Sequence, residues 1–240
     1  MEVEKNIVCF SGGKDSTYLL LWLLENGYRV DDIVYCQIMA TPFISGDFPE
    51  MEDYLCKVEN HIGRRITRVC GKDSFEDVFY RVKEKGDNVG SIYGFPYTIG
   101  AWCNSRLKVC VLDKYFCTVG PHIRYLGIAA DEPKRYARLK PNCRAPLYEE
   151  GIKEEDCIRE LKKRDLYNPM YDKFKRLGCW FCPKQSLDSL RVLYLEYPQY
   201  WQMLLKWDAD SPVSFKPGMS VADLDKRFAY ECRQTTTIHR

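Results

Sequence analysis

Six consecutive residues near the start of the chain, Ser11-Gly12-Gly13-Lys14-Asp15-Ser16, carry groups suited to binding phosphate. The two glycines let the backbone approach an anion closely, so that successive N–H groups can converge on phosphate oxygens. Lys14 adds a positive charge, and the serine hydroxyls are further donors. Asp15 is unfavourable beside an anion unless it caps a helix or faces a magnesium ion bound to the phosphates. The segment therefore predicts a site for a magnesium nucleotide, with a plain strand-to-helix glycine turn as the alternative.

The apolar segments around this loop alternate between short runs typical of strands and longer runs typical of helices. Strands are expected at 6–10, 33–39, 65–70 and 123–130, and helices at 17–25, 49–61, 75–85 and 104–116, with an irregular loop at 91–101. This order predicts an α/β fold with a mostly parallel twisted sheet and helices on both faces. Ligands of such sheets lie beyond the carboxyl ends of the strands, which is where the glycine loop falls.

The pattern changes after Pro146 and Leu147. Helices are expected at 153–164, 186–197 and 200–207, the last two rich in aromatic residues that we attribute to helix packing. We therefore expect a nucleotide-binding α/β domain over 1–147 and a helical C-terminal region over 148–240.

Composition narrows the class of protein. The chain has 240 residues of which 45% are hydrophobic, enough for a full core. Its 36 basic and 34 acidic side chains give a net charge of +2, so no overall field attracts nucleic acid or a membrane. No charged leader precedes an apolar stretch, and no apolar run approaches the ~20 residues that cross a bilayer. We expect a cytoplasmic protein whose 12 cysteines are free thiols or metal ligands rather than disulfides.

The glycine loop resembles the PP-loop of the ATP pyrophosphatase superfamily, whose members cleave ATP between the α- and β-phosphates and usually adenylylate a substrate. Further segments narrow the resemblance: Trp102 to Lys108 (WCNSRLK), Gly127 to Glu132 (GIAADE), Pro146-Leu147 and Gly178 to Pro183 (GCWFCP). Their order is similar to the phosphoadenosine phosphosulfate (PAPS) reductase-like branch. The resemblance covers roughly residues 6 to 210 and implies a fold of the adenine nucleotide alpha hydrolase type.

The resemblance also implies roles for individual residues. Ser11 to Ser16 would hold the pyrophosphate part of ATP with Mg²⁺, and backbone groups near Gln37 and Ile38 would meet the adenine. Arg106 and Lys108 would supply positive charge to the nucleotide or the second substrate. Asp131 and Glu132 would line the site after the fourth strand. The catalytic set is then Lys14, Asp15, Arg106 and Asp131.

Cys179 and Cys182 form a C-x-x-C turn, a spacing with which two thiolates can bind one metal. In the related APS reductases a cysteine at the place of Cys103 joins such a turn to hold an iron-sulfur cluster. Those enzymes have two adjacent cysteines there, whereas this chain has Trp102-Cys103. Three interpretations stay open: a four-cysteine site completed by Cys157 or Cys143, a three-cysteine cluster with one open iron, or no metal. Zinc fits the same ligands as a 4Fe-4S cluster.

The resulting hypothesis is an enzyme that cleaves ATP to AMP and pyrophosphate to adenylylate an unknown second substrate, with sulfur transfer as one outcome. One alternative is a thiol-dependent reductase of PAPS or APS, which the intact Lys14 and the poorly matching Cys232 tail argue against. The other is a non-catalytic nucleotide-binding subunit of a nucleic-acid modification or defence system. The basic stretches 61–72 and 133–140 are either solvated surfaces or contacts to tRNA or DNA. The chain is compatible with a homodimer, and no membrane partner is expected.

Overall fold

The computed structural model describes residues 4–86 and 88–238, and the side chains up to Gln234. Two compact units interleave along the sequence. The first comprises the residues up to Gln37, Pro49–Cys70 and Lys108–Tyr171, and the second comprises Ile38–Phe48, Gly71–Leu107 and the residues from Asp172 onward. The expected boundary after residue 147 falls inside the first unit, and the division into two consecutive domains stays a prediction.

The first unit is built around a five-stranded sheet in the order β5-β2-β1-β6-β7, in which every neighbouring pair is parallel. Its strands are β1 (Lys5–Phe10), β2 (Asp32–Gln37), β5 (Thr67–Cys70), β6 (His122–Leu126) and β7 (Cys143–Arg144). Its helices are α1 (Lys14–Glu25), α2 (Glu50–Ile62), α4 (Cys110–Val119), α5 (Pro133–Tyr136), α6 (Pro146–Glu149) and α7 (Glu154–Lys163). The predicted α/β class with a mostly parallel sheet is confirmed.

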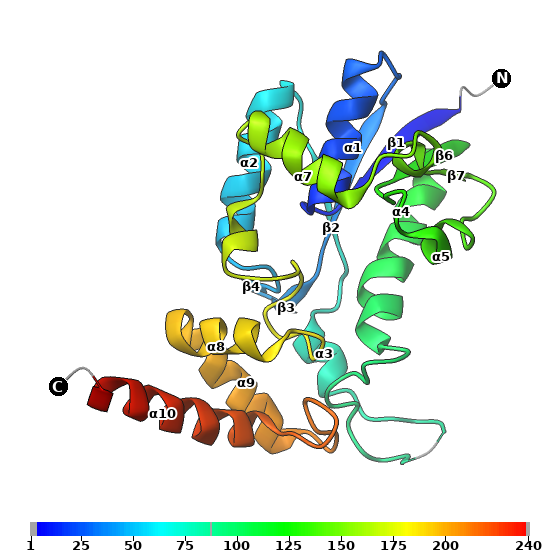
Figure 1. The fold of residues 1–240 in the computed structure, drawn as a ribbon. Coiled ribbons are helices and arrows are strands. Elements are labelled where there is room, and N and C mark those ends of the chain that lie inside the picture. Colours follow the sequence, from blue (N-terminus) through cyan, green and yellow to red (C-terminus); the bar gives the residue numbers. More distant parts are fainter. Residues whose placement is uncertain (1–3, 87, 239–240) are drawn as a thin grey trace. The chain divides into compact units, whose positions relative to one another are not determined.

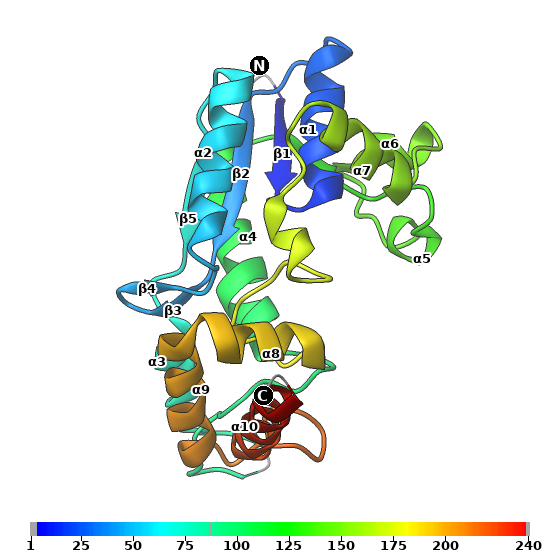
Figure 2. The same cartoon turned by 60° about the vertical axis from the view of Figure 1, so that its left-hand side comes forward.

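Helices cover both faces of this sheet. Ile7 of β1 and Val34 of β2 pack against Phe116 of α4 on one face. Helix α1 packs on β1 and also against α7, and Figures 1 and 2 show α1 and α4 on opposite sides of the strands. Such placement follows from the strand order. The chain runs outward from β1 to β2 and β5, then returns past β1 to β6, and right-handed crossovers in opposite directions put their helices on opposite faces.

The second unit is mostly helical and has an aromatic core. Its elements are β3 (Met39–Thr41), β4 (Ile44–Ser45), α3 (Phe75–Phe79), α8 (Leu187–Glu196), α9 (Pro198–Asp210) and α10 (Val221–Ile238). Trp180 and Trp207 are fully buried and stack with their ring centroids 5.4 Å apart. Both indole N–H groups are satisfied, by the Ser45 carbonyl at 2.9 Å and by Glu76 Oε1 at 3.0 Å. Of the aromatic residues expected to pack in the late helices, Tyr197, Trp201 and Trp207 are buried.

Several expected elements differ from the structure. Strand β2 ends at Gln37 because the next residues turn into the β3–β4 hairpin, and β6 ends at Leu126, four residues before the expected end. Helix α3 spans only Phe75–Phe79, since the chain bends back to pair Val82 with Ile92. The expected helix 104–116 begins as a π-helical turn, Asn104–Val109, before α4. Across the described helices, none is both long and apolar enough to span a bilayer.

Candidate functional site

The glycine loop connects the end of β1 to the start of α1 and needs glycine at its second position. Gly12 has a positive φ of 71°, a region that side chains rarely tolerate. A Cβ there would also lie 2.7 Å from Met51 Sδ. A larger residue at this position would push the end of the Met51 side chain aside and would remain strained by the positive φ, which agrees with a loop that depends on its backbone conformation.

Hydroxyl groups hold this loop in shape. Ser16 Oγ donates to the Gly13 carbonyl at 2.9 Å, and Thr17 Oγ1 donates to the same carbonyl at 3.0 Å. The Ser11 N–H donates to Ser16 Oγ at 3.2 Å, and the two serine hydroxyl oxygens are 2.9 Å apart. The loop is thus ordered by its own side chains.

A segment that the sequence analysis missed braces the loop from outside. Asn168 is fully buried, and its Nδ2 donates to the Gly12 carbonyl at 3.1 Å while its Oδ1 accepts from the Met170 N–H at 3.0 Å. The hydroxyl of Tyr54 lies 2.9 Å from both Thr17 Oγ1 and the Leu166 carbonyl. The available sequence signal was the Asn168-Pro169 pair, which marks a turn but gives no partner for it.

Lys14 is surrounded by groups of the first unit. Its Nζ lies 3.3 Å from Glu154 Oε2, on the first turn of α7, and 5.1 Å from the centroid of the Tyr171 ring. Its backbone N–H donates to the Tyr171 hydroxyl at 3.2 Å. Burial alone would lower the pKa of Lys14, but Tyr171, Asp15 and Glu154 together raise it above its ordinary value. The side chain therefore carries its positive charge at any physiological pH.

Asp15 places the carboxyl group of the loop in a partly buried position. Burial raises the pKa of its carboxyl group to about 6, Lys14 opposes the shift, and Glu154 and Glu132 add to it. Its Oδ1 atom is buried without a hydrogen-bond partner among the described residues. A buried carboxylate with an unsatisfied oxygen costs stability unless a cation binds it. The Asp15 carboxylate is consequently suited to be a ligand of a magnesium ion.

A cavity of about 520 Å³ opens beside the loop, and Ser11 and Ser16 form part of its wall. The strands contribute an apolar floor, with Val34 from β2 and Leu126 from β6, and α4 contributes Leu112 and Phe116. The charged side chains at its wall are mostly basic: Lys108, Arg124, Arg135, Arg138 and Lys140 against Asp113. A molecule with an apolar body and a negatively charged end matches this lining.

Gly127, the residue that follows β6, lies against the loop. A Cβ on this residue would lie 2.6 Å from the Ser16 backbone nitrogen and 2.8 Å from the Asp15 carbonyl carbon. Only a glycine lets the end of β6 contact the first turn of α1 backbone to backbone. The predicted motif Gly127 to Glu132 is thereby placed at the loop, and Glu132 is near enough for its charge to act on Asp15.

The remaining predicted site residues fall into two groups. Lys108 lines the cavity in the first unit, and Asp131 is close enough to act on the Cys157 thiol there. Gln37 ends β2, whereas the Ile38 carbonyl belongs to the second unit and accepts from the Gly46 N–H at 2.7 Å. Arg106 also belongs to the second unit.

Arg106 is engaged with an aromatic ring. Its guanidinium lies 4.8 Å from the Tyr93 ring centroid and donates to the Tyr93 hydroxyl at 2.7 Å. The roles assigned to Arg106, Gln37, Ile38 and Asp131, and equally those of Lys108 and of the loop residues 11–16, stay predictions.

The cysteines expected to bind metal are divided between the units. Cys103, Cys179 and Cys182 lie in the second unit, where the Cys182 N–H donates to the Cys179 carbonyl at 3.0 Å. Burial, followed by the neighbouring Cys182, raises the pKa of Cys103 to about 11. Cys157 lies fully buried on α7 in the first unit, and burial raises its pKa to about 12.

Within the described ranges, no three histidine, cysteine or acidic side chains gather into a group that could bind a metal ion. The alternative fourth ligand, Cys143, lines the cavity instead. As arranged, these residues do not fit a three- or four-ligand cluster, and we derive no chemical step through one.

The two basic stretches differ in how far their charge is neutralised. In 61–72, Arg65 and Arg68 both bond the buried carboxylate of Glu59, and Arg68 also pairs with Glu52. In 133–140, Arg135 pairs with Glu132, while Arg138 and Lys140 line the cavity. The second stretch therefore borders the candidate site, whereas Arg65 and Arg68 of the first stretch are paired with acidic residues of α2.

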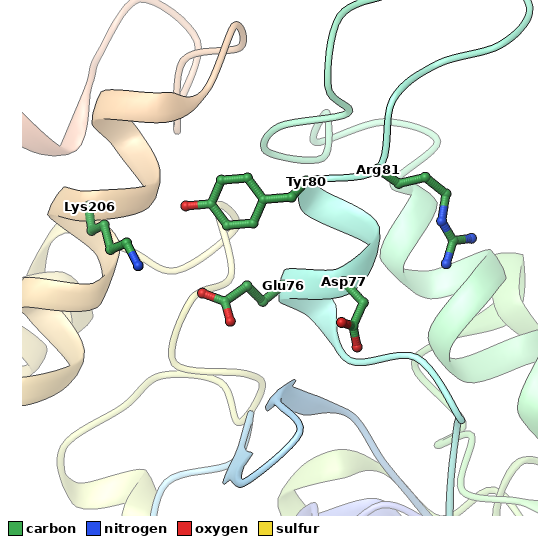
Figure 3. A pocket seen from close by; sticks show the side chains of 5 residues that line it. All are labelled: Glu76, Asp77, Tyr80, Arg81 and Lys206. Carbon is green, nitrogen blue, oxygen red and sulfur yellow. The ribbon is translucent and has the colours of Figure 1, made fainter.

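A second hollow of about 480 Å³ lies in the second unit, between α3 and α9. Figure 3 shows Glu76 and Tyr80 on the side of α3 that faces Lys206, with Arg81 pointing away. Its polar groups serve the fold: the Tyr80 hydroxyl donates to Asp210 at 2.6 Å, and Asp77 caps the start of α3. This hollow offers no comparable set of groups for a ligand.

No protein-family model matches the sequence. The chain is 31% identical over 204 residues to the uncharacterized nin region protein ORF290 of Escherichia phage lambda, a match that covers 77% of this chain and 68% of that protein. The chain belongs to the ORF290 family. It is also 27% identical over 214 residues to the uncharacterized protein MJ0066 of Methanocaldococcus jannaschii, covering 84% of this chain. The chain spans 40% of the length of MJ0066, and neither ORF290 nor MJ0066 has a named activity.

Two solved structures are similar to this member of the ORF290 family. One is a PAPS reductase from Candida auris in complex with phosphate, with a TM-score of 0.47 and 14% identity over 73% of this chain and 81% of that one. The other is the U34-tRNA thiolase NcsA from Methanococcus maripaludis with its [4Fe-4S] cluster, with a TM-score of 0.46 and 18% identity over 95% and 71%. Both structures are at most 18% identical in sequence to this chain.

Proposed function

We propose that this protein binds ATP with magnesium and transfers the adenylyl group to a second substrate, releasing pyrophosphate. The observation that carries the proposal is the position of the glycine loop. It follows β1 at the point where the strand order reverses between β2 and β6, which is where open parallel sheets bind their ligands. The cavity beside it combines an apolar floor with basic side chains, as a nucleotide requires.

In this proposal the phosphates lie at the start of α1 and the nucleoside part enters the cavity. The N–H groups and the dipole of the helix N-terminus favour negative charge, and the Lys14 ammonium adds a full charge. Val34 and Cys36 of β2 and Ile128 after β6 supply apolar surface for a base. Contact of the adenine with backbone groups near Gln37 and Ile38 is part of the same proposal.

Transfer would proceed by attack of a substrate nucleophile on the α-phosphorus. The new bond forms as the bond from that phosphorus to the oxygen bridging to the β-phosphate breaks, and pyrophosphate leaves with the electron pair. Lys14 and the loop N–H groups would stabilise the charge that develops on the leaving oxygens. Arg106 and Lys108 would supply positive charge to the nucleotide or the second substrate, and Asp131 would line the site after β6.

Asp15 is the residue that would hold magnesium, since its orphaned Oδ1 and raised pKa identify a carboxylate that lacks a cation. A bound magnesium would neutralise phosphate charge during transfer. In the absence of the ion, Lys14 and, more weakly, Arg135 oppose the upward shift of the Asp15 pKa.

A more specific version of the proposal is that the enzyme also transfers sulfur to the adenylylated substrate. Cys103 and Cys182 are neighbours in the second unit, and the similar thiolase NcsA carries a [4Fe-4S] cluster. A cluster or zinc on Cys103, Cys179 and Cys182, with Cys157 or Cys143 as a further ligand, would need movement from the arrangement described. Iron, sulfide and zinc analysis of anaerobically purified protein distinguishes these options from free thiols.

The proposal also includes a nucleic-acid substrate such as tRNA or DNA, a homodimer and a cytoplasmic location. No separate set of described residues is assigned to any of these. Arg138 and Lys140 at the cavity are the basic residues best placed to meet an anionic second substrate.

The experiment is incubation of the purified protein with ATP labelled at the α-phosphate, magnesium and candidate substrates, with Lys14→Ala as the matched inactive variant. AMP, an adenylylated product and pyrophosphate are expected. Release of ADP alone would refute adenylyl transfer, and sulfite release from PAPS with a thiol reductant would instead support a sulfonucleotide reductase. Tight binding of ATP without turnover under all conditions would favour a non-catalytic subunit.

A further inference from the structure

Two side chains outside the glycine loop occupy the groups of Lys14 that would bind phosphate. Glu154 Oε2 lies 3.3 Å from the Lys14 ammonium, which is only 15% exposed. The Tyr171 hydroxyl accepts the hydrogen bond of the Lys14 backbone N–H at 3.2 Å. A carboxylate and a hydroxyl oxygen therefore take positions in which phosphate oxygens would satisfy the same donors.

The approach of Tyr171 is built into the fold. Its hydroxyl oxygen is 3.2 Å from the point where a Cβ on Gly13 would lie, so a glycine at this position leaves room for it. The residues before it are docked on the loop through buried Asn168, which bonds both the Gly12 carbonyl and the Met170 N–H. The turn at Asn168 thus both braces the loop and directs Tyr171 toward it.

The contact of Glu154 has a different basis. This residue lies in the first turn of α7, and α7 packs along α1. Its carboxylate is 48% exposed, so it can turn toward solvent at small cost once a stronger anion reaches Lys14. A phosphate group carries more charge than a carboxylate and can use the ammonium and the N–H group together.

We propose that Glu154 and Tyr171 compete with the phosphates of the nucleotide for Lys14 and thereby set the affinity of the site. This inference rests on the proposed function, because it assumes that the loop binds phosphate. In the unliganded protein the two side chains hold Lys14 in place, and binding exchanges them for phosphate oxygens. They act as positioning residues of the ligand-free loop and touch no reacting atom.

The test uses Glu154→Gln, Tyr171→Phe and the double variant of the full chain, with sodium tripolyphosphate and Mg·ATP as probes in titration calorimetry. Removal of a half-exposed ionic competitor should tighten tripolyphosphate binding about two- to fivefold. Release of one N–H donor from a hydroxyl should tighten it about three- to tenfold. The double variant should combine the two effects. Circular dichroism and melting temperature confirm that each variant is folded.

Two control variants match the changes chemically. Glu155→Gln neutralises the next residue of α7, which is exposed and forms no ion pair among those described, and Tyr28→Phe removes the hydroxyl of a tyrosine that is 42% exposed at the far end of α1. Neither should change the affinity. A merely structural role for Glu154 or Tyr171 would weaken binding on substitution, whereas competition predicts tighter binding.

The outcomes separate this inference from the proposed function. Wild-type protein that binds both probes, with variants of equal or weaker affinity, overturns the competition and leaves phosphate binding standing. Absence of binding by the wild type and by the double variant alike overturns both proposals. Binding by the double variant alone would show competition strong enough to close the site. If Glu154→Gln does not fold, Glu154→Ala provides the same removal of charge.

Discussion

Substitution of Asp15 by asparagine should stabilise the ligand-free protein and weaken its binding of Mg·ATP. In the folded chain the pKa of Asp15 is raised from 3.8 to about 6, chiefly by burial. The folded state therefore holds the proton more tightly than the unfolded state, and ionisation of Asp15 costs stability. At 1.36 kcal/mol per pKa unit the shift of about two units sets a ceiling of about 3 kcal/mol. Because water reaches part of the side chain, we expect roughly 1–2 kcal/mol.

The gain in stability of Asp15→Asn over the wild type should grow as the pH rises. Below about pH 3 the carboxyl group is mostly protonated in both states, and Asp15→Asn should change the free energy of unfolding little. As the pH rises through 4 to 6, the unfolded state loses its proton first, so the wild type becomes less stable relative to the variant. The difference should be complete by about pH 7. Urea unfolding at pH 4, 5, 6, 7 and 8, followed by circular dichroism, measures it.

A matched control is Asp53→Asn, which makes the same chemical change at an exposed position of α2. Addition of magnesium should narrow the difference at pH 7 by stabilising the wild type, since the ion supplies the missing partner of Oδ1. A variant less stable than the wild type at pH 7, or a difference independent of pH, would show that Asp15 is already satisfied in solution and would refute the cation site.

Three further predictions concern the surroundings of the loop and the thiols. Gly127→Ala forces its Cβ into the backbone of α1 and should abolish ATP binding measured by calorimetry, whereas Gly178→Ala, whose Cβ would meet nothing closer than 3.9 Å, should bind normally. Asn168→Ala leaves a buried carbonyl without its donor and should lower the free energy of urea unfolding by about 1–3 kcal/mol; an unchanged value would mean that the brace is absent. Any iron or zinc that anaerobically purified wild type contains should be lost in both Cys103→Ser and Cys182→Ser if these thiols rearrange to bind it, and metal retained in both would exclude them as ligands.

The sequence predicted the parallel sheet and the loop well because both depend on local signals. Alternating apolar runs identify buried strands and their helices, and consecutive glycines before a helix identify an anion site. Gly127 was placed near the site only through the resemblance to PAPS reductase-like proteins. Its physical reason, contact with the Ser16 backbone, needs the register of β6 against β1.

The brace around the loop was not predictable, because its residues are distant in sequence. Asn168 bonds a carbonyl 156 positions earlier, and Tyr171 accepts from a backbone group 157 positions earlier. Nothing in an isolated Asn-Pro turn indicates such a partner. Glu154 is similarly an ordinary first-turn acidic residue of a helix in the sequence, and only the packing of α7 on α1 brings it to Lys14.

Lys14 and Asp15 are neighbours in the chain, but their surroundings stabilise the charge of Lys14 and destabilise that of the buried Asp15. Lys14 has found partners in Glu154 and Tyr171, so its charge is stabilised without a ligand. Asp15 has an oxygen without a partner among the described residues, so its charge is destabilised until a cation arrives. A ligand that carries both an anion and a cation supplies the missing partner of Asp15. Its anion must displace Glu154 and Tyr171 from Lys14. Magnesium bound to a polyphosphate meets both demands, whereas a free phosphate chain meets only one. Affinity for ATP should therefore depend on magnesium in the wild type and lose that dependence in Asp15→Asn.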